Sequence, residues 1–324
     1  MDLSYGQEYE TFRSEVKGFL DQYADRQPKA GSGPRSDATK EWQKLLIEHG
    51  YHSRTIPKEY GGYGATPDIL KSRIIAEEFS NAQVNTGFSG QGISMLTPVL
   101  LEMGTEEQKQ TFIKPTIEED MIWCQGYSEP GAGSDLASLT TKAELDGDEW
   151  VINGQKIWTS TAHLADWIFC LVRTEPEAPK HQGISFLLFR MDTPGIEVRP
   201  LVDMTGNANF NEVFFTDVRV PKHQIVGQRG QGWQVANAIL GHERGSLAPP
   251  DAAMSRLNGV IKLMREETIN GERVIDNPVF RDRLMKLQGR VLAMQYNDMR
   301  LLSANINKNQ DCLLYTSPSP RDPL

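Results

Sequence analysis

Cysteine and histidine are scarce in this chain, and neither is spaced for a disulfide framework or a metal site. The three cysteines, Cys124, Cys170 and Cys312, form no C-x-x-C pair, and the six histidines form no H-E-x-x-H or similar pairing. Disulfide-rich secreted domains and structural zinc sites both depend on such regular spacings. We therefore expect no metal, and the cytoplasm, a reducing compartment, is the predicted location.

Basic charge and long apolar runs are also missing. The formal net charge is −9 and no basic stripe is visible, whereas binding to nucleic acid needs clustered lysine and arginine. The first residues, MDLSYGQEYETF, have neither the positive start nor the apolar run of a signal peptide. No stretch reaches the length of a transmembrane helix. These absences exclude nucleic acid as a partner and predict no membrane segment.

The remaining composition is that of a globular protein, and its first third is patterned for helices. The chain has 324 residues, 39% of them hydrophobic and 24% charged, which allows two or more domains with a substantial core. Apolar residues at three- and four-residue steps predict a helix over 6–24 and another near 38–49. Further helices are expected from Pro67, with Thr66 as its cap, to about residue 80, and over 84–103. One more should begin with a capping box formed by Thr105 and Gln108.

The pattern changes at Trp123 and changes back near Gly232. From 123 to about 220, short alternating segments are separated by turn signals, including Asp146-Gly147 and Asn153-Gly154. They predict an antiparallel β domain, a small barrel or sandwich, in which Asn153-Gly154 forms a hairpin turn. After Gly232 we expect helices at 232–244 and at about 251–268. A third should start at Asn277-Pro278, with an apolar stripe of Phe280, Leu284, Leu287, Val291 and Met294.

The predicted fold class is therefore α+β multidomain. Its parts are an N-terminal helical domain at 1–121, a middle antiparallel β-barrel or sandwich domain at 122–225, and a C-terminal helical bundle at 226–311.

The stretch from Trp123 to Ser160 is the candidate site. It reads WCQGYSEPGAGSD, then a strand-rich segment, then NGQKIWTS. Glycines lack a Cβ and let a ligand approach the backbone closely, so the segment around Gly131 and Gly133 could accept a large planar group. The segment is neither a G-x-G-x-x-G fingerprint nor a P-loop. Spacing alone therefore indicates a surface turn or a ligand-binding loop.

The combination of motifs resembles the acyl-CoA dehydrogenase family. SEPGAGSDLAS and DGDEWVINGQKIWTS carry the likeness, and it continues in IPKEYGGYG, GTEEQKQTFIKP, HQGISFLLFRM, NEVFFTDVRVP and GQGW, all in order along the chain. The resemblance implies a three-domain fold and bound FAD. It also implies oxidation of the Cα–Cβ bond of an acyl-CoA thioester to the trans-2-enoyl-CoA, with the α-proton passing to a carboxylate and the β-hydride to flavin N5.

The same resemblance implies a set of cofactor-binding residues on the first part of the stretch. Gln125, Tyr127 and Ser128 match the strand that runs along the flavin ring, and the Ser128 hydroxyl matches a group that bonds its pyrimidine edge. Gln125 departs from the tyrosine of some family members. Ser134 matches a position that touches both FAD and the CoA arm of the substrate.

Three further cofactor-binding residues follow on the outgoing strand. Trp158 matches the residue packed on the flavin ring, and Ser160 matches the hydroxyl beside N5, with Thr159 between them.

The catalytic base implied by the resemblance has two possible positions. Most family members place a glutamate late in the C-terminal domain, beyond the end of this chain. A minority place it on an earlier helix directly before an arginine, and Glu243-Arg244 in ILGHERG matches that position. Glu243 is the candidate base and Arg244 a candidate substrate-binding residue. The alternative is that Glu243 is an ordinary carboxylate and the base lies in a segment that this chain lacks.

Two departures concern the C-terminal region. Residues 312–324 (CLLYTSPSPRDPL) look unlike a continuing bundle and are predicted to be a non-native tail, so that the chain would be C-terminally truncated. The family's Arg-x-x-Phe-Gly segment, which contacts the partner subunit's FAD, is replaced by NGERVIDNPVF, where Arg273 could supply a positive charge. The missing Arg-x-x-Phe-Gly segment suggests a divergent, bacterial-type branch and puts the contact with the partner subunit's FAD in doubt.

Partners and alternatives follow from the same resemblance. It implies an acyl-CoA substrate of unspecified chain length, electron-transfer flavoprotein as acceptor, and a homodimer or homotetramer when full length. Two other functions stay open: a flavin oxidase or monooxygenase on this scaffold, and a non-catalytic FAD-binding subunit or fragment.

Overall fold

The computed structural model describes residues 6–29, 31–246 and 250–306, with the side chains of 243–246, 250–251 and 301–306 left out. The chain divides into two compact units. The helical unit comprises Met1–Asp25, Pro67–Asn85 and Leu247–Leu324, and the sheet unit comprises Arg26–Thr66 and Thr86–Ser246. Along the chain the elements run helical, then β, then helical, as the sequence predicts.

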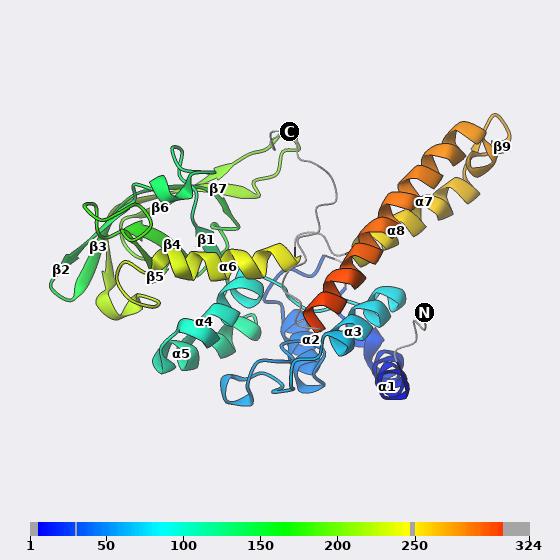
Figure 1. Cartoon of the computed structure of the whole chain (residues 1–324), viewed down its shortest axis with the longest axis horizontal. Helices are drawn as coiled ribbons and strands as arrows, with labels where there is room; N and C mark the ends of the chain where they lie inside the picture. The colour runs from blue at the N-terminus through cyan, green and yellow to red at the C-terminus, as the bar shows by residue number, and fades with distance from the viewer. Residues whose placement is uncertain (1–5, 30, 247–249, 307–324) are drawn as a thin grey trace. The chain divides into compact units, whose positions relative to one another are not determined.

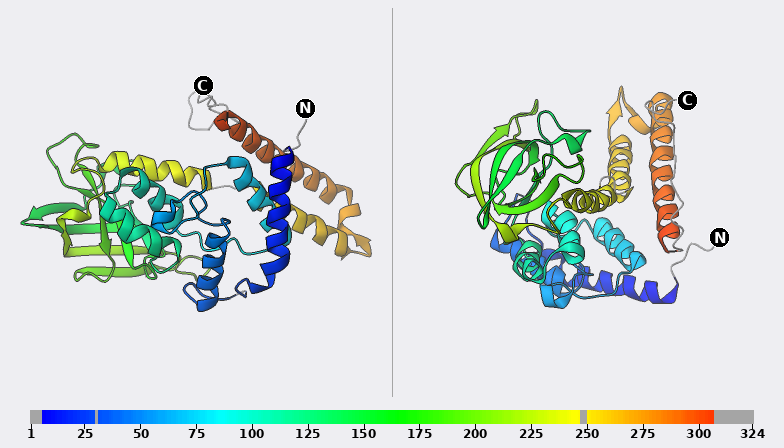
Figure 2. Two further views of the ribbon diagram at one scale, coloured as in Figure 1. Left: turned by 90° about the horizontal axis from the view of Figure 1, so that it is seen from below. Right: turned by 60° about the vertical axis from the view of Figure 1, so that its left-hand side comes forward.

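The sheet unit is built on a curled sheet of seven strands (Figures 1 and 2). The strands are β1 (Trp123–Gly126), β2 (Lys142–Asp146), β3 (Glu149–Ser160), β4 (Trp167–Arg173), β5 (Ile184–Arg190), β6 (Ile196–Leu201) and β7 (Phe210–Pro221). Their order is β1-β4-β2-β3-β7-β6, with β5 paired to β4. The predicted middle β domain is confirmed, but the sheet is mixed and not purely antiparallel, because β1 and β2 both pair with β4 in parallel.

The turn chemistry of this sheet was predicted correctly at one place and wrongly at another. Asp146-Gly147 lies at the turn between β2 and β3, where Gly147 has φ 64°. Asn153-Gly154 is not a turn. It lies inside β3, because pairing with β7 continues on both sides of a bulge between Ile152 and Gly154. A Cβ on Gly154 would lie 2.6 Å from Thr141 Oγ1, so this glycine permits close approach of the neighbouring chain.

The same unit also contains helices (Figure 1). They are α2 (Asp37–Glu48), a π-helical turn at Gly92–Leu96, α4 (Thr97–Met103), α5 (Glu106–Ile117) and α6 (Gly232–Ser246), with short 3₁₀ turns at Lys58–Tyr60, Leu136–Ser138 and Lys222–Gln224. The helix expected over 84–103 begins only near residue 91, after a non-helical segment. The predicted capping box of Thr105 and Gln108 is confirmed. A shared apolar core joins α4, α5 and α6 to β4 and β5.

The helical unit contains α1 (Gln7–Tyr23), α3 (Ile69–Ala82), α7 (Pro250–Glu266), a small hairpin of β8 (Thr268–Ile269) and β9 (Glu272–Arg273), and α8 (Pro278–Ile306). A 3₁₀ turn, Ala24–Arg26, follows α1, and another, Val274–Asp276, precedes α8. In this unit α1 packs on α3 and α7 on α8. None of the helices in the described part of the chain has the length and apolar character to cross a membrane.

Local signals in the helical unit were partly right. Asn277 caps α8, since its Oδ1 accepts a hydrogen bond from Val279 N at 3.0 Å. The cap of α3 is Asp68 and not Thr66, because its carboxylate accepts from Lys71 N at 3.0 Å. On the predicted α8 stripe only Leu284 and Val291 are buried, in a small core with α7, while the other three side chains are exposed.

Candidate functional site

The segment from Ser128 to Ser134 is a tight turn with an open outer face. Glu129 N donates to Ala132 O at 2.9 Å and Ala132 N returns a bond to Glu129 O at 3.0 Å. A Cβ on Gly131 or Gly133 would meet no heavy atom within 4 Å beyond its chain neighbours, and neither glycine has a positive φ. Neither packing nor backbone conformation within the described residues therefore requires glycine at these two positions. They leave the outer face of the turn free for another molecule.

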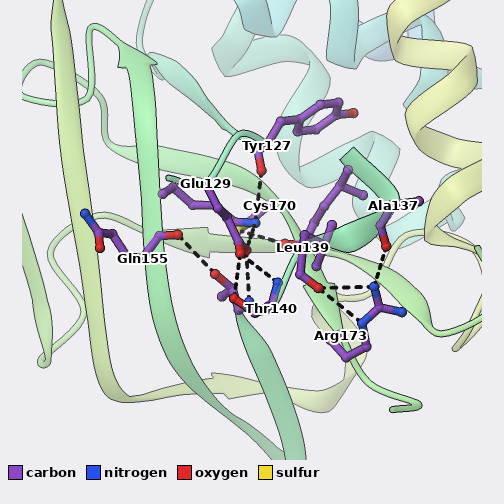
Figure 3. Close-up of polar contacts among 11 residues, drawn as sticks. Tyr127, Glu129, Ala137, Leu139, Thr140, Gln155, Cys170 and Arg173 are labelled. Atoms are coloured by element: carbon purple, nitrogen blue, oxygen red, sulfur yellow. Dashed lines mark hydrogen bonds and ion pairs between the residues drawn. The ribbon is translucent and has the colours of Figure 1, made fainter. Parts of the chain in front are cut away.

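A buried ion pair fixes this turn to strand β3 (Figure 3). Lys156 Nζ lies 2.8 Å from Glu129 Oε1 and donates to Tyr127 O at 3.1 Å, and the Lys156 side chain is fully buried. The other carboxylate oxygen, Glu129 Oε2, accepts from Thr140 N at 2.6 Å and from its hydroxyl at 2.8 Å, while Oε1 also accepts from Thr141 N at 2.9 Å.

The electrostatics of this pair explain why two charges are stable inside the unit. Burial alone would raise the pKa of Glu129, but the Lys156 ammonium and the hydrogen bonds from Lys156, Thr141 and Thr140 outweigh burial and lower the pKa to about 2. The carboxylate is therefore ionised at neutral pH. Every charge in the pair has a partner, as a buried ion pair requires.

Arg173 secures the chain just beyond the turn. From β4 its guanidinium donates to Ala137 O at 2.6 Å and to Leu139 O at 3.1 and 3.2 Å (Figure 3). Sequence reasoning missed Glu129, Lys156 and Arg173. The sequence held a signal for Lys156. Its side chain lies on the same inward-facing side of β3 as Trp150 and Ile152, and a lysine buried there requires an anionic partner.

The end of β3 presents an exposed, conformationally strained tryptophan. The ladder between β3 and β7 is irregular between Lys156 and Thr159. This bulge shifts the alternation, so that Thr159 is buried and Trp158 is 59% exposed. Trp158 has φ 61°, a rare conformation for a bulky residue, and its ring meets Phe210 edge-on at 6.0 Å. A large aromatic face is thus held out of the core.

The structure brings most of the predicted cofactor-binding residues onto neighbouring segments. Ile157 N donates to Ser128 O at 2.9 Å, which places the start of the turn beside the Trp158–Ser160 corner. Ser128 and Ser160 are half-buried, and Ser134 is exposed on the turn. Tyr127 is buried, with its ring edge-on to two phenylalanines at 6.2 and 6.4 Å, so it contributes to the core under the turn.

Among the buried polar atoms near this corner, several have no hydrogen-bond partner within the described part of the chain. They include Gln125 Nε2 on β1 and Thr159 Oγ1 on β3. Buried donors without partners cost about 1–3 kcal/mol each and are uncommon. Their presence beside an open turn and an exposed aromatic face is typical of a binding site for a planar, polar-edged ligand.

The predicted base and substrate-binding pair cannot be placed in this geometry. The backbone of Glu243 and Arg244 lies in α6, but their side chains are outside the described residues. The neighbouring His242 lies with Nε2 3.6 Å from Glu102 Oε1.

Comparisons with known proteins match most of the chain to one protein family. The family models for the acyl-CoA dehydrogenase N-terminal, middle and C-terminal domains match residues 6–120, 124–218 and 230–313. The acyl-CoA dehydrogenase IpdE1 of Mycobacterium tuberculosis (strain ATCC 25618 / H37Rv) is 40% identical over 299 residues, which cover 89% of this chain and 76% of the relative. FadE34 of the same organism, another acyl-CoA dehydrogenase, is 42% identical over 222 residues, 68% of this chain and 31% of the relative.

Solved structures show the same fold. The Tcur3481-Tcur3483 steroid ACAD has a TM-score of 0.77 at 33% identity, covering 95% of this chain and 79% of that one. The ChsE4-ChsE5 complex from Mycobacterium tuberculosis has a TM-score of 0.76 at 30% identity, covering 94% and 78%. The matched family models and the named relatives thus define an oxidoreductase of the acyl-CoA dehydrogenase type. The chain belongs to the acyl-CoA dehydrogenase family.

The residues of the corner fit the flavin that members of this family use. The pyrimidine edge of a flavin offers both hydrogen-bond donors and acceptors. Gln125 Nε2 and the Thr159 hydroxyl, which have no partner in the described part of the chain, could bond to it. The exposed face of Trp158 offers a surface on which an aromatic ring can stack. The glycine turn leaves backbone free for close approach.

Proposed function

We propose that this chain binds FAD and oxidises an acyl-CoA thioester between Cα and Cβ to the trans-2-enoyl-CoA. One observation carries the proposal. In a chain of the acyl-CoA dehydrogenase family, a strained and exposed Trp158 lies beside a buried Thr159 hydroxyl that has no partner among the described residues. Strain and unsatisfied polarity at one corner are typical of binding and catalytic sites. A flavin held there satisfies the polar atoms and covers the aromatic face.

In this proposal the turn and the end of β3 hold the cofactor. Ser128 and Ser160 supply hydroxyls, Gln125 and Thr159 supply the buried donors, and Trp158 packs on the ring. Tyr127 supports the turn from below, and Ser134 reaches toward both cofactor and substrate. FAD, when bound, supplies the acceptor for the hydride that leaves Cβ.

The proton chemistry is assigned to α6. The Glu243 carboxylate would take the α-proton, and Arg244 would attract the negatively charged CoA part of the substrate or orient the base. The alternative base is a carboxylate in a segment that this chain does not contain. The roles given to Glu243 and Arg244 rest on their match to the Glu-Arg pair of some family members.

Substrate, acceptor and assembly are proposed from the family. One structural relative is described as a steroid ACAD, so the substrates to test include CoA esters of steroid carboxylic acids beside straight and branched acyl chains. We propose electron-transfer flavoprotein as the acceptor, a homodimer or homotetramer as the assembly, and the cytoplasm as the location. The free cysteines Cys124 and Cys170 are consistent with a reducing compartment.

The decisive experiment is the visible absorption spectrum of the purified chain, before and after anaerobic addition of this acyl-CoA panel. We expect a flavin spectrum that one class of ester bleaches. The same titration with Glu243→Gln tests the base, since loss of bleaching with flavin retained supports Glu243 and unchanged bleaching rejects it. A colourless protein that takes up no added FAD contradicts the proposal.

The same sample separates the other two functions. Rapid oxygen consumption after reduction by the ester would indicate an oxidase or monooxygenase. A flavin that stays oxidised with every ester would indicate a non-catalytic FAD-binding subunit or fragment.

A further inference from the structure

The Trp158 corner is strained, and the strain lies at a residue type that is unsuited to it. The β3–β7 ladder has two bulges. At the first, the positive φ values fall on Gly154 and Asp217, and glycine and aspartate are residue types that adopt such angles at low cost. At the second, the positive φ falls on Trp158. A tryptophan persists in such a conformation only where its surroundings hold it there.

One side chain is placed to hold it. Asn211, on β7, pairs with Thr159 across the ladder, and its Nδ2 donates to Thr159 O at 2.9 Å. Asn211 is fully buried, and its Oδ1 has no hydrogen-bond partner among the described residues. A buried asparagine that uses one half of its amide and leaves the other half unsatisfied is costly. The Asn211 amide therefore adds little net stability to the folded state. Its effect is to fix the backbone carbonyl of Thr159, the residue after Trp158.

We propose that Asn211 is a positioning residue of the flavin site. Its amide holds the Thr159 carbonyl, which fixes the bulge, keeps Trp158 at positive φ and turns its ring outward, beside the hydroxyl of Ser160. Asn211 is fully buried on β7, and the role proposed for it is to hold the backbone of the site. This role rests on the proposed function, because an outward-facing Trp158 ring serves the site only if it packs on a bound flavin.

The first bulge provides a matched control. There Asn153 Nδ2 donates to Asp217 Oδ1 at 3.0 Å, and Asp217 N donates to Asn153 Oδ1 at 2.9 Å. This clamp has the same residue type, the same two strands and the same kind of irregularity. It lies at a part of the ladder that carries none of the candidate site residues, so its loss should not disturb the site.

The first test measures FAD binding to apoprotein and the visible spectrum of the bound flavin. Asn211→Leu and Asn211→Asp keep the shape of the side chain but lose the amide donor. We expect both to weaken FAD binding by about tenfold, the effect of one buried hydrogen bond, and to shift the flavin absorption bands. Asn153→Leu should leave both unchanged. Wild-type affinity and spectrum in the Asn211 variants would overturn the inference alone, whereas a wild-type chain that binds no FAD would overturn the proposed function and the inference with it.

A second test needs no flavin and covers the case in which the Asn211 variants bind FAD poorly only because they are less stable. The effect of Asn211→Leu on the unfolding temperature is measured in the natural chain and again in a Trp158→Gly background, where positive φ needs no support. We expect a larger effect in the glycine background, because there the loss of the hydrogen bond is not offset by relief of strain at position 158. Equal effects in both backgrounds would show that the amide does not hold the strained corner.

Discussion

The buried ion pair of Glu129 and Lys156 should make a large contribution to the free energy of unfolding of the sheet unit. Lys156→Met removes the ammonium but keeps an apolar stem of similar length. The Glu129 carboxylate, with 4% of its side chain exposed, is then left without its counter-charge. Breaking a buried pair in this way costs about 3–5 kcal/mol, because the remaining charge stays desolvated.

The pKa of Glu129 gives a second measure of the same interaction. It is lowered from 4.5 to about 2, and each unit of pKa corresponds to about 1.4 kcal/mol, which gives at most about 3.5 kcal/mol. A lowered carboxylate pKa contributes stability that is complete above the unfolded value near 4.5 and is lost as the pH falls toward about 2. The wild type should therefore lose stability over that acidic window, and Lys156→Met should lose much less there.

Urea unfolding at neutral pH and through the acidic window measures both quantities. Lys180→Met is the control, because its partner Asp135 lies directly after the same turn but both side chains are more than 60% exposed. Such a surface pair contributes at most about 1 kcal/mol. A cost for Lys156→Met no larger than that of Lys180→Met would refute the reasoning, and so would an unchanged acid profile.

Three further predictions concern other parts of the sheet unit. Trp158→Gly should be more stable than Trp158→Ala by about 0.5–1 kcal/mol, because both lose the ring but only glycine relieves the positive φ; thermal unfolding of the apoproteins measures the difference, and equal midpoints would contradict it. In a Cys312→Ser background, Cys124 and Cys170 should resist a thiol reagent at mildly alkaline pH until the chain unfolds. Both thiols are fully buried, and burial raises the pKa of Cys170 to about 12 and the pKa of Cys124 well above its usual value. Rapid labelling of the native protein would contradict this burial. Gly232→Ala should destabilise the start of α6 by at least about 1–3 kcal/mol, because its Cβ would lie 2.4–2.8 Å from the β5 backbone; a loss below about 0.5 kcal/mol in urea unfolding would mean that the two elements can separate freely.

Helix positions could be predicted because their signals are local. The capping box of Thr105 and Gln108, and the Asn277 cap of α8, are short-range patterns that the structure reproduces. The Asn153-Gly154 dipeptide misled because its conformation depends on pairing with β7, some sixty residues away. Sequence spacing could not show that the strand continues through it.

The candidate site was located by its motif, but its internal construction was not predictable. Ser128 and Ile157 meet through a backbone hydrogen bond between segments that are not consecutive in the sheet. The outward turn of Trp158 results from a bulge opposite Asn211, and no local pattern specifies it. Lys156 offered a clue, since a charged residue on a buried alternation demands a partner. Its partner Glu129 could be identified only from the three-dimensional arrangement.

The parallel pairing of β1 with β4 has a consequence for how the protein folds. The residues paired in this ladder are separated by about forty positions, with the glycine turn and the β2–β3 hairpin between them. Contacts between residues so far apart in the sequence form late, because closing the large loop between them costs conformational entropy before any contact is gained. During synthesis β1 leaves the ribosome before its ladder partner exists. The turn that follows β1 can therefore take its final position only after β4 has emerged, so the candidate site cannot form from β1 to β3 alone.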